Sequence, residues 1–209
     1  MIAVVDFGRG NLLSIAQALR HCGAGEVEIT DDAEAVLAAE RIVLPGVGAF
    51  ADAMRALQAR GLVAALRQAA ARGTPMLGIC LGMQLFADES EEFGRHDGLG
   101  LVAGAVRRLP AGNGPGAIRI PNVGWRALEV RRPDPIAAGL AEGAMMYFVH
   151  SYAHAPADAG DVVATIAVNG VQVAAMVRKG GLIGCQFHPE KSGETGLAVI
   201  RNFVALDRS

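Results

Sequence analysis

The chain has 209 residues, of which 52% are hydrophobic and 19% are charged. Its 19 Lys and Arg nearly balance 21 Asp and Glu, for a net charge of −2, which argues against a nucleic-acid-binding surface or a polybasic membrane patch, and no apolar stretch reaches the length of a membrane span. The three cysteines are too widely spaced for a disulfide framework or a zinc site, so we expect a reducing, cytoplasmic setting.

The first 90 residues are predicted to alternate short apolar strands with amphipathic helices. Strands are expected at residues 2–7, 27–30, 41–44 and 76–79. Helices are expected at residues 12–22, directly after Asp31 and Asp32, and at 49–60 and 62–72. Nearly continuous apolar strands that alternate with helices are typical of a parallel sheet covered on both faces.

The pattern changes after residue 98, where glycine, proline and short β-type runs replace the helices. Further strands are predicted at residues 105–109, 126–130, 145–152, 162–168, 171–177 and 182–187, and a last helix at 193–206. Asn169-Gly170 is a hairpin signal between two of these strands. We expect an α/β fold in a single domain over residues 1–209, with a mostly parallel central sheet flanked by helices and an added antiparallel or mixed extension.

The segment Gly78-Ile79-Cys80-Leu81-Gly82 carries the most chemical information. It has the form of a nucleophile elbow, with Cys in place of Ser, at the junction of a buried strand and a helix. The two glycines would leave room for the sharp turn, and the N–H of Leu81 would point at an oxyanion. The alternative is a buried structural cysteine, which most lone cysteines are.

A cysteine nucleophile needs a base and a group that orients the base. His188 and Glu190 flank Pro189, and in extended backbone two residues at this spacing face the same side. The alternative is a surface salt link. A metal site of Cys80, His150 and His188 also stays open, although no short ligand pair supports it, and no metal or cofactor is predicted.

Together these segments and Pro45-Gly46-Val47-Gly48 resemble the class I (triad) glutamine amidotransferase family, over essentially the whole chain. The resemblance implies hydrolysis of the side-chain amide of L-glutamine through a thioester on Cys80, with His188 moving protons and Glu190 orienting it. It also implies two oxyanion donors, the N–H groups of Leu81 and Val47, with a peptide flip between Gly46 and Gly48. The substrate-binding residues it implies are Gly48, Gln84, Ser151 and Tyr152.

Four further segments, at residues 6–12, 121–125, 147–152 and 186–192, resemble one branch of this family. In that branch the ammonia passes to a (β/α)₈-barrel cyclase subunit of histidine biosynthesis, so the resemblance implies such a partner in a heterodimer. The residues that match partner-contacting or ammonia-gating positions are Asn11, Val123, Trp125, Tyr147 and Lys191. Phe7 and Asn122 depart from the pattern, in which Tyr and His are expected.

Three other interpretations compete. The chain could serve another triad amidotransferase, but the segments at 121–125 and 147–152 favour the histidine branch. A Cys hydrolase that works without a partner would have no reason to combine Gln84 with the segment at 45–48. A non-catalytic scaffold subunit is disfavoured because Cys80, His188 and Glu190 are all present.

Overall fold

The computed structural model describes residues 1–112, 114 and 117–206. Of the range 1–209 expected for the domain, residues 113, 115, 116 and 207–209 lie outside the described part. None of the described helices is both long enough and apolar enough to cross a bilayer.

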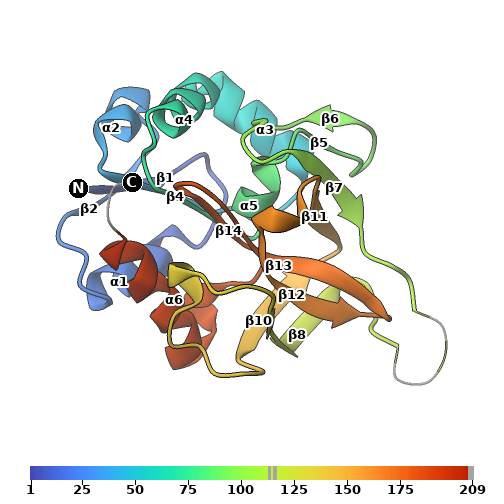
Figure 1. The fold of residues 1–209 in the computed structure, drawn as a ribbon. Coiled ribbons are helices and arrows are strands. Elements are labelled where there is room, and N and C mark those ends of the chain that lie inside the picture. Colours follow the sequence, from blue (N-terminus) through green and yellow to red (C-terminus); the bar gives the residue numbers. More distant parts are fainter. Residues whose placement is uncertain (113, 115–116, 207–209) are drawn as a thin grey trace.

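The central sheet has, within the described residues, eight strands in the order β2-β1-β3-β4-β14-β13-β12-β9 (Figure 1). The first five are parallel: β1 (Ile2–Val5), β2 (Val27–Thr30), β3 (Arg41–Leu44), β4 (Met76–Ile79) and β14 (Leu182–Cys185). The last three are antiparallel: β13 (Val171–Lys179), β12 (Val162–Val168) and β9 (Glu129–Val130). The predicted α/β class and the mostly parallel sheet with an antiparallel extension are therefore confirmed.

Helices cover both faces of the parallel strands, as Figure 1 shows. One face carries α1 (Leu12–His21) and α6 (Gly193–Ala205), and the other carries α2 (Ala33–Ala38), α3 (Phe50–Ala59) and α4 (Leu62–Ala71). Successive side chains of a strand point to opposite faces, so Val4 lies in the first core while Ala3 and Val5 lie in the second. This double burial explains why the strands are apolar at every position.

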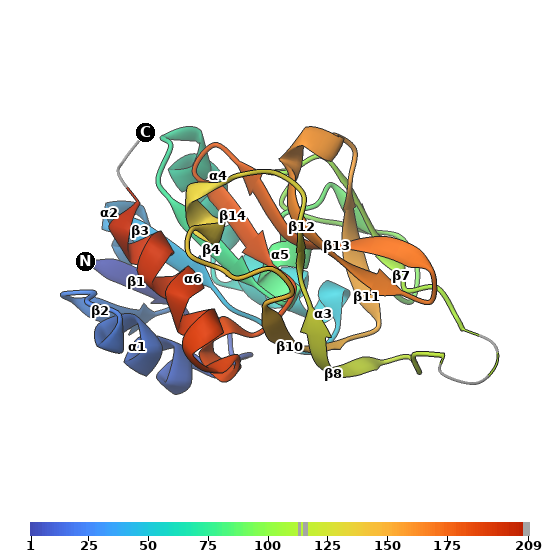
Figure 2. The same ribbon diagram turned by 60° about the horizontal axis from the view of Figure 1, so that its bottom comes forward.

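Two smaller sheets lie beside the antiparallel end of the central sheet (Figure 2). One pairs β8 (Asn122–Ala127) with β10 (Met145–His150), and the other has the order β11-β7-β5-β6. The strands of the latter are β11 (Tyr152–Pro156), β7 (Gly104–Arg108), β5 (Glu89–Ser90) and β6 (His96–Asp97). The remaining short elements are α5 (Leu81–Leu85) and three 3₁₀ turns, η1 (Pro135–Ala137), η2 (Ala159–Asp161) and η3 (Pro189–Lys191).

Two of the predicted strands are each divided in two in the structure. The run at 145–152 is interrupted at Ser151, because β10 pairs with β8 while β11 pairs with β7 in a different sheet. The run at 126–130 is divided at Leu128, which is buried between β8 and β9. Both divisions follow from pairing between segments that are distant in the sequence, which a local pattern does not contain.

Candidate active site

A cavity of about 330 Å³ opens at the end of β4, where Cys80 follows the strand. Its lining includes seven of the predicted site residues, Val47, Gly48, Cys80, Leu81, Gln84, Ser151 and Tyr152. His188 and Glu190 lie outside that lining, with side chains that are only 4% and 1% exposed. The structure thus gathers the predicted substrate-binding residues around Cys80 and buries the predicted base and its carboxylate beside it.

Cys80 sits on the strained turn that the sequence predicts. Its backbone has φ 54° and ψ −109°, a conformation that residues other than glycine rarely adopt. Gly82 allows the next turn of chain to pass close to β3, since a Cβ atom there would lie 1.7 Å from the carbonyl oxygen of Leu44. The elbow therefore depends on the glycine two residues after the nucleophile.

His188 and Glu190 make the predicted contact, by a different backbone route. Nδ1 of His188 lies 3.0 Å from Oε1 of Glu190. His188 is extended, but Pro189 opens η3, so Glu190 is brought back by a 3₁₀ turn and not by the alternation of a strand. The expectation of extended backbone was wrong because Pro favours the first position of a helical turn.

The surroundings of His188 favour its charged form. Burial disfavours the imidazolium, but the neighbouring Cys80 and Glu190 groups outweigh it and raise the pKa of His188 to about 9. Nε2 of His188 is buried and has no geometrically well-formed hydrogen bond within the described residues. Oriented through Nδ1, the ring keeps Nε2 as the nitrogen available for proton transfer.

The two predicted oxyanion donors are not paired in this conformation. The N–H of Leu81 donates to the carbonyl oxygen of Gly46, at 3.3 Å. In a trans peptide the carbonyl and the following N–H point in opposite directions, so the N–H of Val47 points away from that position. A rotation of the Gly46–Val47 peptide would exchange the carbonyl for an N–H donor.

Gln84 is buried and oriented before any ligand binds. Its Nε2 donates to the carbonyl of Tyr152 at 2.8 Å and to Oε1 of Gln186 at 3.0 Å. Nε2 of Gln186 in turn lies 3.7 Å from Sγ of Cys80. Because both donors of Gln84 are occupied, its Oε1 stays available as an acceptor.

Sequence reasoning gave no role to three residues of the site: Glu92, Gln186 and Ser192. Glu92 lines the cavity and accepts a hydrogen bond from the N–H of Phe50 at 2.6 Å, although its charged segment is typical of a solvated loop. Gln186 and Ser192 are buried at the two ends of a motif that the sequence had already singled out. Among the described side chains, no three His, Cys, Asp or Glu are grouped as metal ligands.

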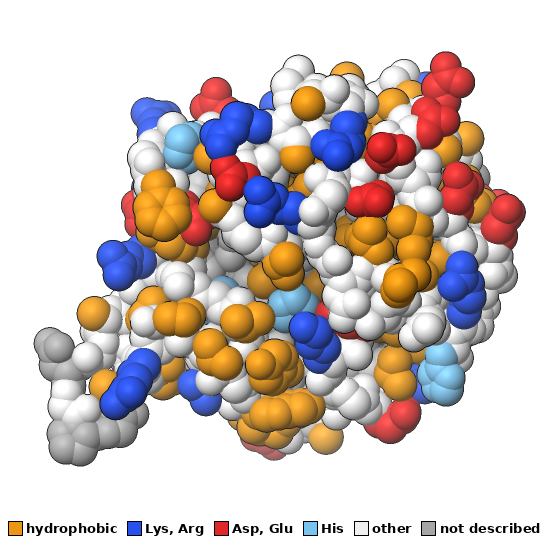
Figure 3. Space-filling model, turned by 180° about the vertical axis from the view of Figure 1, so that it is seen from behind, with side chains coloured by type: hydrophobic (Ala, Val, Ile, Leu, Met, Phe, Trp, Pro, Cys, Tyr) orange, Lys and Arg blue, Asp and Glu red, His pale blue; other side chains and the backbone are white. Residues whose placement is uncertain are grey.

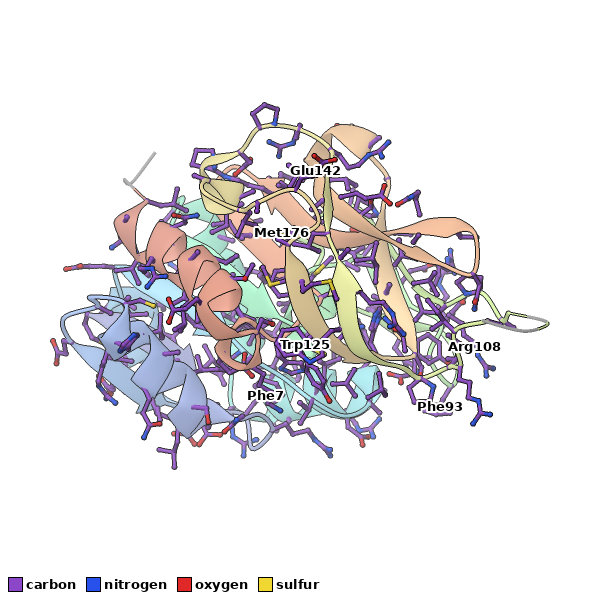
Figure 4. All side chains as sticks on the ribbon, turned by 90° about the horizontal axis from the view of Figure 1, so that it is seen from below. Phe7, Phe93, Arg108, Trp125, Glu142 and Met176 are labelled. Atoms are coloured by element: carbon purple, nitrogen blue, oxygen red, sulfur yellow. The ribbon has the colours of Figure 1, made fainter. Side chains whose placement is uncertain are left out.

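Strands β8 and β10 present an apolar surface, the β8–β10 face, on the side of the molecule viewed in Figure 3. It consists of Val123, Trp125, Met145, Tyr147 and Val149. Trp125, labelled in Figure 4, is 47% exposed and makes an edge contact with Tyr147 at 6.0 Å between ring centroids. Asn11 precedes α1 and Lys191 ends η3, and both are exposed.

Comparisons with known proteins agree with this geometry. The family model "Glutamine amidotransferase class-I" matches residues 3–206. A HisH subunit of imidazole glycerol phosphate synthase from Moorella thermoacetica is 48% identical over 207 residues, which cover 99% of this chain and 95% of that protein. The HisH subunit of Geobacillus kaustophilus is 46% identical over 207 residues, 99% of this chain and 97% of the relative.

A solved structure described as a glutamine amidotransferase superposes with a TM-score of 0.74. It is 20% identical and covers 98% of this chain and 99% of its own, so it supports the fold. From the family match and the full-length relatives, the chain belongs to the class-I glutamine amidotransferase family, among the HisH subunits of imidazole glycerol phosphate synthase.

Proposed function

We propose that Cys80 hydrolyses the side-chain amide of L-glutamine and that the ammonia passes to a (β/α)₈-barrel cyclase subunit bound over the β8–β10 face. The chain would act as the glutaminase subunit of imidazole glycerol phosphate synthase in L-histidine biosynthesis. The observation that carries this proposal is the buried His188–Glu190 pair beside a cysteine on a strained elbow. A structural cysteine would need neither the strain nor the pair.

The reaction would begin with the thiolate of Cys80 and the imidazolium of His188. The sulfur attacks the side-chain carbonyl carbon of glutamine, and His188 gives its proton to the departing ammonia. The thioester that remains is attacked by water, which loses a proton to His188, and glutamate leaves as the thiolate re-forms. Glu190 would hold the imidazole by Nδ1 and stabilise its charged form in both steps.

The cavity offers acceptors for the donor groups of the substrate. Glutamine donates hydrogen bonds through its ammonium group and its amide NH₂ group. Two acceptors in the cavity suit these groups, namely Oε1 of Gln84 and the carboxylate of Glu92. Gly48, Ser151 and Tyr152 complete the lining on either side. Its volume of about 330 Å³ suits a ligand of amino-acid size.

The oxyanion pair would form only after the Gly46–Val47 peptide rotates. The N–H of Val47 would then replace the Gly46 carbonyl beside Leu81, and the tetrahedral intermediate would receive two donors. Rotation would be coupled to the partner, since Val47 is 42% exposed at the rim of the cavity. Such coupling would keep ammonia from being released before the acceptor is in place.

The partner surface and the setting belong to the same proposal. An exposed apolar face with an aromatic centre is typical of a protein interface, and Asn11 and Lys191 would extend it with polar groups. The thiols of Cys22, Cys80 and Cys185 are all free, which suits a reducing cytoplasm.

The test uses the complex with the cyclase subunit. Cys80→Ala is expected to abolish synthesis from glutamine and to preserve synthesis from ammonium salts, since the acceptor site lies in the partner. Cys22→Ala is the matched control, because this thiol is remote from the elbow and contacts the carbonyl of Leu197. Loss of both syntheses with Cys80→Ala would show that the cysteine is structural.

A further inference from the structure

A chain of hydrogen bonds connects strand β8 to the cavity without using the catalytic residues proposed above. Nε of Arg126 donates to Oδ1 of Asn122 at 2.9 Å. Nδ2 of Asn122 lies 3.0 Å from Nε2 of His150, and Nδ1 of His150 lies 2.9 Å from the carbonyl oxygen of Tyr152. Asn122 and His150 are both buried, with 0% and 6% of their surface exposed.

The groups at the two ends of this hydrogen-bond chain fix the position of every proton within it. Arg126 can only donate, so it must face the oxygen of the Asn122 amide, which turns the NH₂ group toward His150. Nε2 of His150 is then an acceptor, and Nδ1 carries the proton that the carbonyl of Tyr152 requires. His150 is thereby held as one neutral tautomer.

A neutral His150 matters because a second histidine is close. Burial, and then the charges of His188 and Arg126, outweigh the Tyr152 hydrogen bond and lower the pKa of His150 to about 4. The other titratable groups that share its surroundings are Cys80 at the end of β4 and Glu92 between β5 and β6. Of the two histidines, only His188 then carries the proton that the reaction transfers.

The same hydrogen-bond chain also stabilises the break between β10 and β11. Residues 149–152 line the cavity where one strand leaves its sheet and the next begins in another. The His150 ring spans this bend by bonding the carbonyl two residues ahead, and the same carbonyl accepts from Gln84. The bend and the Gln84 side chain are therefore held at one oxygen atom.

The two faces of strand β8 carry different kinds of side chain. Asn122, Gly124 and Arg126 alternate with the more exposed Val123 and Trp125. Gly124 has φ 130° and no side chain between Asn122 and Arg126, so the guanidinium lies across it, with Nη1 3.9 Å from where a Cβ would be. One face of β8 thus exposes Val123 and Trp125 to a partner, and the other face carries the side chains that bond to His150 at the cavity.

We propose that Asn122 and Arg126 are positioning residues for glutamine hydrolysis that act through His150. They fix the tautomer of its imidazole and hold Ser151, Tyr152 and Gln84 in place around the bound glutamine. This inference rests on the proposed glutaminase function and adds two residues to its machinery.

The test measures KM and kcat for glutamine in the complex with the cyclase subunit. Asn122→Leu keeps the side-chain size and removes both hydrogen bonds, and Arg126→Met removes the donor at the end of the chain. Arg126→Met is expected to raise KM by about tenfold, the effect of one lost buried hydrogen bond, and Asn122→Leu by at least as much, each with a smaller change in kcat. Arg126→Lys retains a donor and is expected to stay within about twofold of the unmodified complex.

Asn122→Asp adds a readout that a structural role would not change. A carboxylate accepts from Arg126 and also from a protonated Nε2, so it raises the pKa of His150. Activity that requires a neutral His150 is then lost at a higher pH, and the acid limb of kcat/KM shifts upward. Asn122→Leu introduces no charge and is expected to leave that limb in place.

Asn202→Leu is the matched control for the cost of losing a bonded Asn amide, which at this position donates to the carbonyls of Ile136 and Ala138. It is expected to leave KM unchanged. The inference is overturned if Asn122→Leu and Arg126→Met keep the original KM, or if the Asn122→Asp profile coincides with that of the unmodified complex. Glutamine-dependent synthesis that survives Cys80→Ala would overturn the proposed function instead.

Discussion

The main-chain N–H of Leu81 donates to the carbonyl oxygen of Gly46, at 3.3 Å. Leu81 follows the candidate nucleophile, and Gly46 belongs to a separate loop after β3. A carbonyl oxygen therefore occupies the place where an oxyanion would need a second donor. The site has its proposed nucleophile, base and carboxylate assembled, but its proposed oxyanion pair is not assembled.

This arrangement predicts a strong dependence on the partner. One missing oxyanion donor costs about 10²–10³ in rate, so the isolated subunit should hydrolyse glutamine at least that much more slowly than the complex whose cyclase holds its own substrate. Steady-state release of glutamate by the two forms measures the difference. A lone subunit that reaches the full rate of the complex at saturating glutamine would contradict the prediction.

The buried His188, whose pKa is raised first by Cys80 and then by Glu190, predicts how stability changes with pH. The pKa of His188 is raised from 6.5 to about 9, and a raised pKa adds stability that is complete below the pKa of the unfolded chain. That contribution is lost as the pH rises toward and through about 9, so the titration of His188 makes the free energy of unfolding fall over that range. Urea unfolding at several pH values measures the fall.

Glu190→Gln supplies the comparison for that measurement. It keeps an oxygen acceptor for Nδ1 but removes the charge, so the pKa of His188 drops and the loss of stability with rising pH becomes shallower. Identical pH dependence in the original and the variant would show that Glu190 does not stabilise the imidazolium.

Ser192 links the candidate base to strand β10. Its Oγ donates to the carbonyl of His188 at 2.7 Å and accepts from the N–H of Tyr147 at 3.0 Å. Ser192→Ala removes one of the hydrogen bonds that hold the backbone of His188, and small displacements of a catalytic group are costly, so kcat should fall by about tenfold. The variant should also lose about 1–3 kcal/mol of stability, since two buried polar groups lose a partner.

Ser90→Ala is the contrasting variant, because Ser90 is equally buried but its Oγ accepts from the N–H of Glu92 at 3.2 Å. It should raise KM for glutamine and change kcat less. The kcat of each sample is corrected for the fraction of unfolded protein. If Ser192→Ala and the original protein then have equal kcat values, Ser192 does not position His188.

The elbow could be predicted from sequence because its requirements are local. A strand, a cysteine and two spaced glycines specify the turn at Cys80, and the structure shows why Gly82 is needed. The pairing of His188 with Glu190 was also predictable from their spacing, although Pro189 produces it through a 3₁₀ turn. Local residue chemistry was enough in both cases.

The features that escaped prediction depend on distant segments or on single peptide planes. Nothing in the run 145–152 marks Ser151 as a break, because the break reflects which strand each half pairs with. Glu92 is drawn into the cavity by a hydrogen bond from the N–H of Phe50, far away in the sequence. The direction of the Gly46 carbonyl has no signature in composition or periodicity.

The β8–β10 face predicts where the cyclase binds. Trp125 is a large aromatic side chain that is 47% exposed beside Tyr147, and aromatic anchors dominate the energy of protein interfaces. Trp125→Ala should weaken the complex by at least about 2 kcal/mol, or roughly 30-fold in Kd. Isothermal titration of the two subunits measures this change.

Val171→Ala is the control, because Val171 is 48% exposed at the start of β13, outside the face, and it should leave Kd unaltered. A Kd for Trp125→Ala equal to that for Val171→Ala would contradict the assignment of Trp125 as the anchor of the interface.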